Sequence, residues 1–274
     1  ILLFRAGGKE AYILPVISME NIAAVRGSLL MPFGSPQNLF LFGRSGISFG
    51  CFVLHMLPLW ISSAILLSGF ILLLYRKNLR ETITLTSNTG KTWRPERKRQ
   101  RVVYLCLFVL IVATIISRTP YWPVAAGIVL AAVLAFDQEV LAKTDYVLLL
   151  TFLCFFVFSS QITANETFSS FLTNAVGGHE YLWGIGLSQL ISNVPTSIVL
   201  YPFTENLAAL LYGVDTAGLC SIIGSLASVI NYRIYVRSYP DGGMRFLRVF
   251  TLISWAFFLI VAVPGYLLSQ YWRF

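Results

Sequence analysis

The stretch SQLISNVPTSIVLYPFTEN, residues 188–206, places hydroxyl, amide and carboxyl side chains inside apolar sequence. Pro195 and Pro202 interrupt it, and a proline inside a helix removes a backbone donor and clashes with the preceding turn. Ser192 and Asn193 can supply side-chain oxygens, and an interrupted backbone adds free carbonyls. Such oxygens suit a hard cation such as sodium, whereas hydroxyl and amide donors suit an oxyanion. The motif predicts the tip of a re-entrant hairpin that binds an ion, and the alternative is an ordinary loop in water.

The rest of the sequence offers few groups for catalysis. His55 and His179 are isolated, and the four cysteines are scattered through apolar stretches without the spacing of a metal site. No nucleophile–base arrangement, phosphate-binding loop or dinucleotide fingerprint occurs. We therefore expect neither an enzyme nor a bound cofactor, apart from a sodium ion near Ser192 and Asn193.

The composition indicates that most of the chain lies in lipid. Of its 274 residues, 57% are hydrophobic and only 12% are charged, whereas a soluble domain usually has about 25% charged residues. Leu, Ile and Phe dominate the apolar runs without the alternation of barrel strands, which indicates helices. The strongest runs are 47–75, 102–117, 121–136, 146–160 and 246–269. The predicted fold class is an all-α polytopic membrane protein.

Basic residues gather in one place. The net charge is +8, and nine of the basic residues lie between Arg76 and Arg101, against only Glu81 and Glu96. A basic run beside a membrane helix is usually a topology signal that marks the cytoplasmic side. We therefore expect a cytoplasmic loop at 76–101 that contacts anionic lipid headgroups, and no nucleic-acid partner.

This loop fixes the predicted direction of the other segments. The interrupted segment 188–206 is too short for a net crossing, so it enters from the outer face and returns to that face. The next crossing then ends in the cytoplasm, and Arg233, Arg237 and Arg245 agree with this placement. The sequence thus predicts a re-entrant helical hairpin near 181–212.

Two short stretches resemble each other and cross the membrane in opposite directions in this topology. SLLMPFGSPQN (28–38) and SIIGSLASVIN (221–231) both begin with Ser and two aliphatic residues and both end with Asn. A small residue followed by Ser occurs at matching positions in both. Chance similarity is the alternative, but inverted repeats with helices broken near the membrane midplane are typical of secondary transporters. We expect unwound centres near Gly34 and Ala227.

Four stretches also resemble a known family. They are GSLLMPFGSPQNLFLF (27–42), DYVLLLTFLCFFVF (145–158), SQLISNVPTSIVL (188–200) and SIIGSLASVINYRIY (221–235). They are similar to the ion transporter superfamily, and above all to bacterial arsenite/citrate permease-like anion permeases. The resemblance covers nearly the full chain. It implies two inverted halves, each with a re-entrant hairpin and a broken helix, and substrate and often sodium bound between the hairpin tips.

The resemblance also implies a division of the chain and a set of site residues. Residues 1–75 would end the first inverted repeat, 76–101 would form the basic loop, and 102–274 would form the second repeat. The family's first hairpin would lie before Ile1. The positions that match the family's site are Ser192, Asn193, Pro195 and Thr196 at the hairpin, Gly224, Ser225 and Ser228 in the second broken helix, and Gly34, Ser35, Gln37 and Asn38 in the first.

The sequence departs from the family pattern close to this site. Similar proteins tend to read Ala-Asn-x-Gly-Ser before the first motif, and this chain reads AVRGS (24–28), with Val25 and Arg26. Ser35 stands where they tend to have Asn, and FSSQ (158–161) replaces a Gly-Asn pair. An arginine within a membrane segment is a functional residue by default. Arg26 therefore either binds an anion or marks a degenerate copy of the motif.

Three functions fit these observations. The first is a secondary transporter that moves a small anion, either a carboxylate or an inorganic oxyanion, coupled to sodium or protons. The second is a cation/proton antiporter, which usually needs buried acids, whereas Asp137, Asp145 and Asp215 fall at predicted helix ends. The third is a non-transporting fragment of such a permease. The expected location is the inner (plasma) membrane of a bacterium, and a homodimer is a candidate assembly.

Overall fold

The computed structural model describes residues 1, 4–5, 7–76 and 97–271. All regular structure in this part of the chain is helical, which confirms the predicted all-α fold. The chain divides into two units, one made of Ile1–Ser87 with Phe155–Phe274 and the other of Asn88–Cys154. Most of the predicted cytoplasmic loop at 76–101 lies outside the described residues, so its placement stays a prediction.

The smaller unit is a pair of apolar helices with a short third one. Its helices are α5 (Arg97–Ser117), α6 (Trp122–Phe136) and α7 (Gln138–Ala142), and α8 (Tyr146–Ala164) begins in this unit and ends in the other. The α5 and α6 helices pack together, and the Tyr104 hydroxyl donates to Asp137 Oδ2 at 2.9 Å where α6 ends. The prediction of helices at 102–117 and 121–136 is confirmed.

Two long helices frame the larger unit. They are α4 (Phe49–Tyr75) and α14 (Gly243–Tyr271). At 1.5 Å per residue, 27 and 29 residues exceed the roughly 30 Å of a bilayer core. Five helices in the described part of the chain are long and apolar enough to cross a membrane. The chain is thus an integral membrane protein.

The first predicted broken helix is present. It consists of η1 (Glu10–Tyr12), α2 (Ile13–Gly27), η2 (Ser28–Leu30), η3 (Pro32–Gly34) and α3 (Pro36–Ser45). Met31 and Ser35 are extended, so the α-helical hydrogen bonding stops between them. Gly34 is required because a Cβ there would overlap the carbonyl oxygen of Ser28. The predicted unwound centre near Gly34 is confirmed.

The second broken helix follows a hairpin. In order, the elements are α9 (Glu166–Val176), α10 (Glu180–Ile191), α11 (Asn193–Leu200), η4 (Tyr201–Phe203), α12 (Leu207–Ala217), α13 (Leu226–Ser238) and η5 (Pro240–Gly242). The chain is non-helical between α12 and α13, over residues 218–225. The prediction of an unwound centre near Ala227 is wrong, because Ala227 already lies in the first turn of α13, behind the N-cap Ser225.

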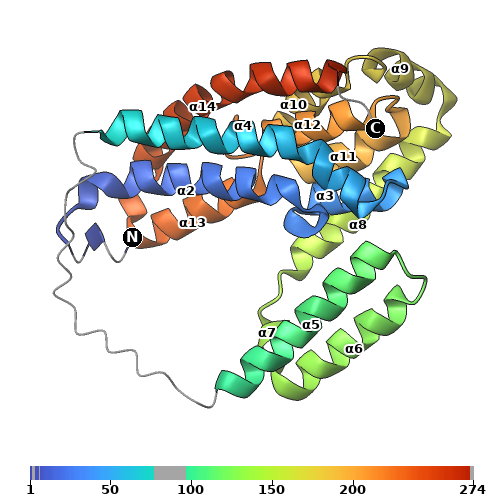
Figure 1. Ribbon diagram of the computed structural model, residues 1–274, viewed down its shortest axis with the longest axis horizontal. Helices are drawn as coiled ribbons and strands as arrows, with labels where there is room; N and C mark the ends of the chain where they lie inside the picture. The colour runs from blue at the N-terminus through green and yellow to red at the C-terminus, as the bar shows by residue number, and fades with distance from the viewer. Residues whose placement is uncertain (2–3, 6, 77–96, 272–274) are drawn as a thin grey trace. The chain divides into compact units, whose positions relative to one another are not determined.

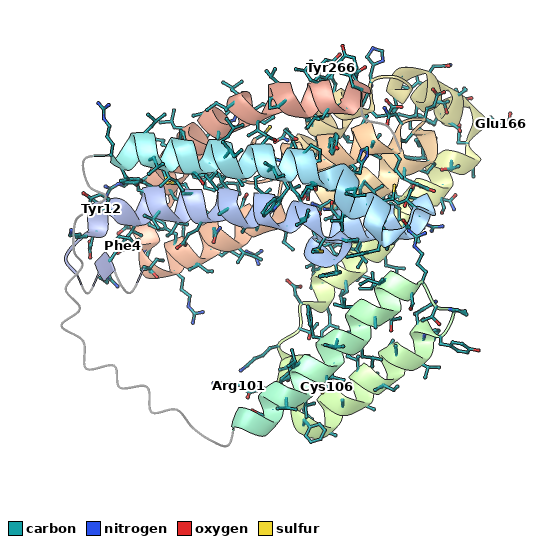
Figure 2. All side chains as sticks on the ribbon, in the orientation of Figure 1. Phe4, Tyr12, Arg101, Cys106, Glu166 and Tyr266 are labelled. Atoms are coloured by element: carbon teal, nitrogen blue, oxygen red, sulfur yellow. The ribbon has the colours of Figure 1, made fainter. Side chains whose placement is uncertain are left out.

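The larger unit has two opposite ends, and aromatic and aliphatic side chains pack together at one of them. At one end, the rings of Phe4 and Tyr12 lie together (Figure 2) with centroids 6.4 Å apart, and Tyr12 lies 5.9 Å from Tyr75 at the end of α4. The core of this end is formed by α2, α13 and the start of α14, through Ile13, Leu14, Ile17, Tyr235, Phe246 and Phe250. Figure 1 shows α2, α13, α4 and α14 side by side.

A candidate substrate site where two broken helices cross

The two broken helices lie antiparallel. The α2 helix packs on α13, and α3 packs on α12, so the first half of each broken helix contacts the second half of the other. Two helices that run in opposite directions make both of these contacts when their breaks lie close together. This is the antiparallel pairing that inverted repeats require, and it places both breaks at one crossing.

The two breaks share their backbone geometry. Ser35 has φ −147° and ψ 153° as the N-cap of α3, and Ser225 has φ −148° and ψ 137° as the N-cap of α13. Both follow a glycine, at 34 and 224, that leaves no room for a Cβ. The structural register therefore pairs Gly34-Ser35 with Gly224-Ser225, and the predicted pairing with Ala227-Ser228 was three residues out.

The hairpin consists of α10 and α11, which are separated by a single residue. Ser192 has φ 72° and ψ 158°, a combination that a non-glycine residue adopts at a cost of about 1–3 kcal/mol. Pro195 lies in the first turn of α11, where its missing N–H has no partner to lose, but it would clash with Ile191 if α10 continued. The predicted break at this motif is confirmed, and Ser192 is the turning point.

The base of the hairpin is held by a buried carboxylate. Glu180 at the start of α10 is 2% exposed, and its Oε1 accepts hydrogen bonds from the backbone N–H groups of Glu205 (3.2 Å) and Asn206 (3.0 Å). The Asn206 side chain then donates to Ser269 O at 3.2 Å near the end of α14. The hairpin thus begins and ends at the same end of the unit, as a re-entrant hairpin does.

The hairpin tip contacts the break of the second helix. Asn193 is 3% exposed, and its backbone N–H donates to Gly224 O at 3.3 Å. Gln189, one turn before the tip, donates from Nε2 to Ala217 O (3.2 Å) and accepts from Ser221 Oγ (2.7 Å). The tip is therefore fastened to both sides of the break by hydrogen bonds.

Gly218 marks the point where three elements come together. A Cβ at this position would lie 3.2 Å from Val25 Cγ1, 3.4 Å from Ser225 Cβ and 3.6 Å from Asn193 Nδ2. These atoms belong to the end of α2, the N-cap of α13 and the start of α11, respectively. The hairpin tip and both broken helices thus meet within a few ångströms.

A buried carboxylate lies beside this point. Asp215, in the last turn of α12, is 1% exposed, and its Oδ1 accepts from Gln37 Nε2 at 2.9 Å. With its amide oriented to suit its neighbours, Asn38 donates from Nδ2 to Asp215 Oδ1 (2.9 Å) and Oδ2 (3.0 Å) and to Ser35 Oγ (3.2 Å). Asp215 lies at a helix end, as predicted, but this end of α12 is buried inside the protein.

A second network of polar side chains links α2 to α13. Asn21 of α2 is fully buried and donates from Nδ2 to Ser228 Oγ at 3.1 Å, while Asn231 donates to Asn21 Oδ1 at 2.9 Å. Each buried amide then has a partner, so these hydrogen bonds stabilise the contact between α2 and α13. Ser228 is therefore engaged in the packing of two helices, one turn away from Ser225.

The predicted residues thus form three groups. Gln37 and Asn38 bond to Asp215, and Ser35 bonds to Asn38. Asn193 and Ser225 lie beside Gly218, and Gly224 accepts from the Asn193 backbone. Ser228 bonds to the Asn21 side chain. Thr196 lies on α11 with its hydroxyl buried and without a hydrogen-bond partner. The predicted sodium ligands Ser192 and Asn193 lie at the tip, and their roles and those of the other predicted residues stay predictions.

Sequence reasoning missed Asp215, Glu180, Gln189 and Asn21. Each is a polar residue inside an apolar stretch, which is the same signal that selected Asn193. Asp215 was predicted only as a helix end, and Glu180, Gln189 and Asn21 were not singled out as site residues. The burial of Glu180 and Asp215, at 2% and 1% exposure, follows from helices that begin and end within the protein.

Comparisons with known proteins support a membrane transporter. The citrate transporter family profile matches residues 4–224. The inner membrane protein YbiR of Escherichia coli is 31% identical over 92% of this chain and 65% of its own length. An uncharacterised transporter of Methanocaldococcus jannaschii is 28% identical over 80% of this chain and 58% of its own length. A 46 kDa membrane protein of Mycobacterium leprae is 24% identical over 80% and 59%.

No solved structure matches this chain. The chain spans about two thirds or less of the length of these curated relatives, at 65%, 58% and 59%. The family profile covers far more than half of the chain, and it includes the first broken helix, the hairpin and the second break up to Gly224. The chain belongs to the citrate transporter family.

Proposed function

We propose that the chain acts, within the full-length protein, as a secondary active transporter of a small anion in the inner membrane of a bacterium. The anion would be a carboxylate or an inorganic oxyanion, and the gradient would be one of sodium or protons. The observation that supports this most is the meeting of the hairpin tip with both broken helices around Gly218. Interrupted helices at one depth are how transporters of this architecture expose backbone groups to a substrate.

The helix directions at the crossing favour an anion. Three helices begin there, α3 behind Ser35, α11 behind Ser192 and α13 behind Ser225. A helix N-terminus has free N–H groups and the positive end of the helix dipole, and both attract negative charge. Arg26, at the end of α2, adds a full positive charge. Backbone carbonyls at the hairpin tip, with Ser192 and Asn193, provide oxygens for a sodium ion.

The family name favours a carboxylate as the first anion to test, and citrate is the first probe. Uptake of labelled citrate would be measured in proteoliposomes that contain the full-length protein, with a sodium gradient, a pH gradient, or neither. Unlabelled succinate, phosphate and sulfate would then compete. Competition by succinate alone indicates a carboxylate site, and competition by phosphate or sulfate indicates a site for inorganic oxyanions.

Asn193→Ala tests the position of the site. The substitution removes a buried amide at the meeting point, where a lost hydrogen bond costs about 1–3 kcal/mol. We expect the apparent affinity for the transported anion to weaken roughly five- to a hundredfold. Asn174→Ala is the matched control, because Asn174 is exposed on α9 and should leave uptake unchanged.

Uptake would be compared at substrate concentrations below half-saturation. Equal uptake by the wild-type protein and Asn193→Ala would rule out the proposed site, provided that both proteins insert equally. If the wild-type protein moved neither anions nor cations, the third possibility, a degenerate permease, would hold instead.

A cation/proton antiporter is the second candidate, and one observation favours it. Asp215 is a buried acid at a helix break, the kind of residue that antiporters use to bind a cation and a proton in turn. Proteoliposomes with an internal pH indicator separate the two functions. An antiporter should move protons when sodium or potassium chloride is added without any organic anion, and an anion transporter should not.

A further inference from the structure

Arg26 is a buried cation whose hydrogen-bonding groups have no partner. It lies in the last turn of α2 and is 3% exposed. Its Nε, Nη1 and Nη2 atoms are all buried, and none of them has a hydrogen-bond partner in the described structure. A guanidinium presents five N–H donors in a fixed planar fork, and leaving a buried charged group unbonded is among the largest single penalties in a folded protein.

The surroundings balance the charge of Arg26 without using its donors. Asp215 attracts it electrostatically, but the two side chains form no direct ion pair. The Asp215 carboxylate instead accepts hydrogen bonds from Gln37 and Asn38 of α3, which hold it in place. The C-terminal ends of α2 and α12, which are the negative ends of their dipoles, add further attraction.

None of the other titratable groups near this pair accepts a hydrogen bond from Arg26. Tyr181 of α10 donates its hydroxyl proton to Ala262 O at 2.9 Å, and Tyr212 donates to His55 O at 2.6 Å. Cys220, in the break, is a neutral thiol and a weak acceptor. The donors of Arg26 thus have no partner in the described structure, and Val25, its neighbour in sequence, lies beside Gly218 at the crossing.

We propose that the Arg26 guanidinium binds an acidic group of the transported anion, and that Asp215 is the negative charge that balances Arg26 when the site holds no anion. This inference rests on the proposed function. A carboxylate, phosphate or sulfate group fits the planar fork with two parallel hydrogen bonds. The bound anion and Asp215 then share one cation, so Asp215 weakens anion binding. Arg26, which departs from the family pattern, is on this inference a substrate-binding residue of this chain.

Two substitutions test this arrangement in opposite directions. The measurement is the thermal unfolding midpoint of the purified full-length protein in detergent, titrated with potassium citrate or potassium sulfate against potassium chloride of equal ionic strength. Arg26→Gln should weaken anion binding roughly ten- to a hundredfold, because it removes charge-assisted hydrogen bonds. Asp215→Asn keeps the acceptor for Gln37 but removes the competing charge, so anion binding should tighten about tenfold.

The unfolding midpoint without anion gives a second readout. Arg26→Gln should be at least as stable as the wild-type protein in potassium chloride, because a neutral amide replaces a buried charge without hydrogen bonds. If Arg26 and Asp215 instead formed a structural salt bridge, Arg26→Gln and Asp215→Asn would both be less stable than the wild-type protein. Arg233→Gln is the matched control, because Arg233 is exposed on α13 and should change neither readout.

Several outcomes would overturn the inference. An Arg26→Gln protein that binds the anion with wild-type affinity would overturn it. An Asp215→Asn protein that binds the anion no more tightly than the wild-type protein would also overturn it. The second test holds even if Arg26→Gln fails to fold. Loss of uptake in Asn193→Ala together with unchanged anion affinity in Arg26→Gln would contradict this inference and leave the proposed function intact. A wild-type protein that binds and transports no anion would contradict both.

Discussion

Gln37 shows how a single side chain can hold a buried charge in place. Its Nε2 donates to Asp215 Oδ1 at 2.9 Å, and Gln37 itself is 5% exposed. A buried carboxylate needs such donors, because an ionised group without hydrogen bonds is costly in a low-dielectric interior. The bond also joins the start of α3 to the end of α12, so it connects the two broken helices at their crossing.

Gln37→Met should therefore reduce stability. The substitution keeps the side-chain length but removes one donor from a buried charged acceptor, a loss of about 1.5–3 kcal/mol. In the Asp215→Asn background the same substitution should cost less than half as much, because the acceptor is then neutral. Thermal unfolding of the four proteins in detergent gives this double-mutant cycle.

Gln161→Met is the control for this cycle. Gln161 is exposed on α8, and its substitution should change stability little in either background. Equal losses for Gln37→Met in both backgrounds would show that the hydrogen bond to the Asp215 carboxylate contributes nothing beyond side-chain packing.

At the scale of elements, the hairpin depends on how closely α10 approaches α12. These two helices make the most extensive helix–helix contact of the larger unit. A Cβ at Gly213 would lie 2.5 Å from Tyr181 O, and one at Gly184 would lie 3.1 Å from Val214 N. Small residues at such crossings let two backbones touch, which is how helices associate in a membrane. The two glycines therefore set the distance between the hairpin and the second broken helix.

Gly213→Ala should force the two helices apart. The added methyl group meets backbone, which cannot move as a side-chain tip can, and overpacking of this kind typically costs about 1–3 kcal/mol. We expect a lower unfolding midpoint and weaker anion binding, because α12 also carries Asp215. Both would be measured on purified protein.

Gly186→Ala is the matched control on the same hairpin. Gly186 is exposed on α10, and a Cβ there meets nothing within 4 Å. This substitution should stabilise the helix by roughly 0.5–1 kcal/mol, since alanine is the better helix former. A Gly213→Ala protein as stable as Gly186→Ala would show that the α10–α12 contact is loose.

At the scale of the larger unit, different sets of contacts lie at its two opposite ends. Glu180, Asn206 and Ser269 are joined at one end, and Tyr12, Tyr75 and Tyr235 lie at or near the other. The broken helix α12–α13 leads from the first end to the second. In a bilayer, this arrangement places both ends of the hairpin on one side and the end of α13 on the opposite side.

Cysteine labelling tests this arrangement. In a background free of Cys51, Cys106, Cys154 and Cys220, single cysteines would replace the exposed residues His179, Glu205 and Asp241. A membrane-impermeant maleimide should reach positions 179 and 205 from the same side, and 241 only from the other. Labelling of 179 and 205 from opposite sides would exclude the re-entrant hairpin.

The sequence alone determined the features that depend on local chemistry. Low charge and apolar runs placed the helices in lipid, since no other solvent accepts so much exposed Leu, Ile and Phe. Pro195 identified the break at the hairpin tip, and Gly34 identified the first unwound centre, because each residue restricts the backbone wherever it stands. These properties hold whatever the rest of the chain does.

Only the tertiary structure decided which residues form the site. Asp215 and Arg26 are far apart in the chain, and they become neighbours because α12 and α2 both end inside the protein, beside the crossing. The register of the repeat shifted by three residues, from Ser228 to Ser225, since helix termini are set by packing at the crossing and by close backbone contacts such as that of Gly224 with Ala217. Local residue types fix where a helix can break, but long-range packing fixes what lies beside the break.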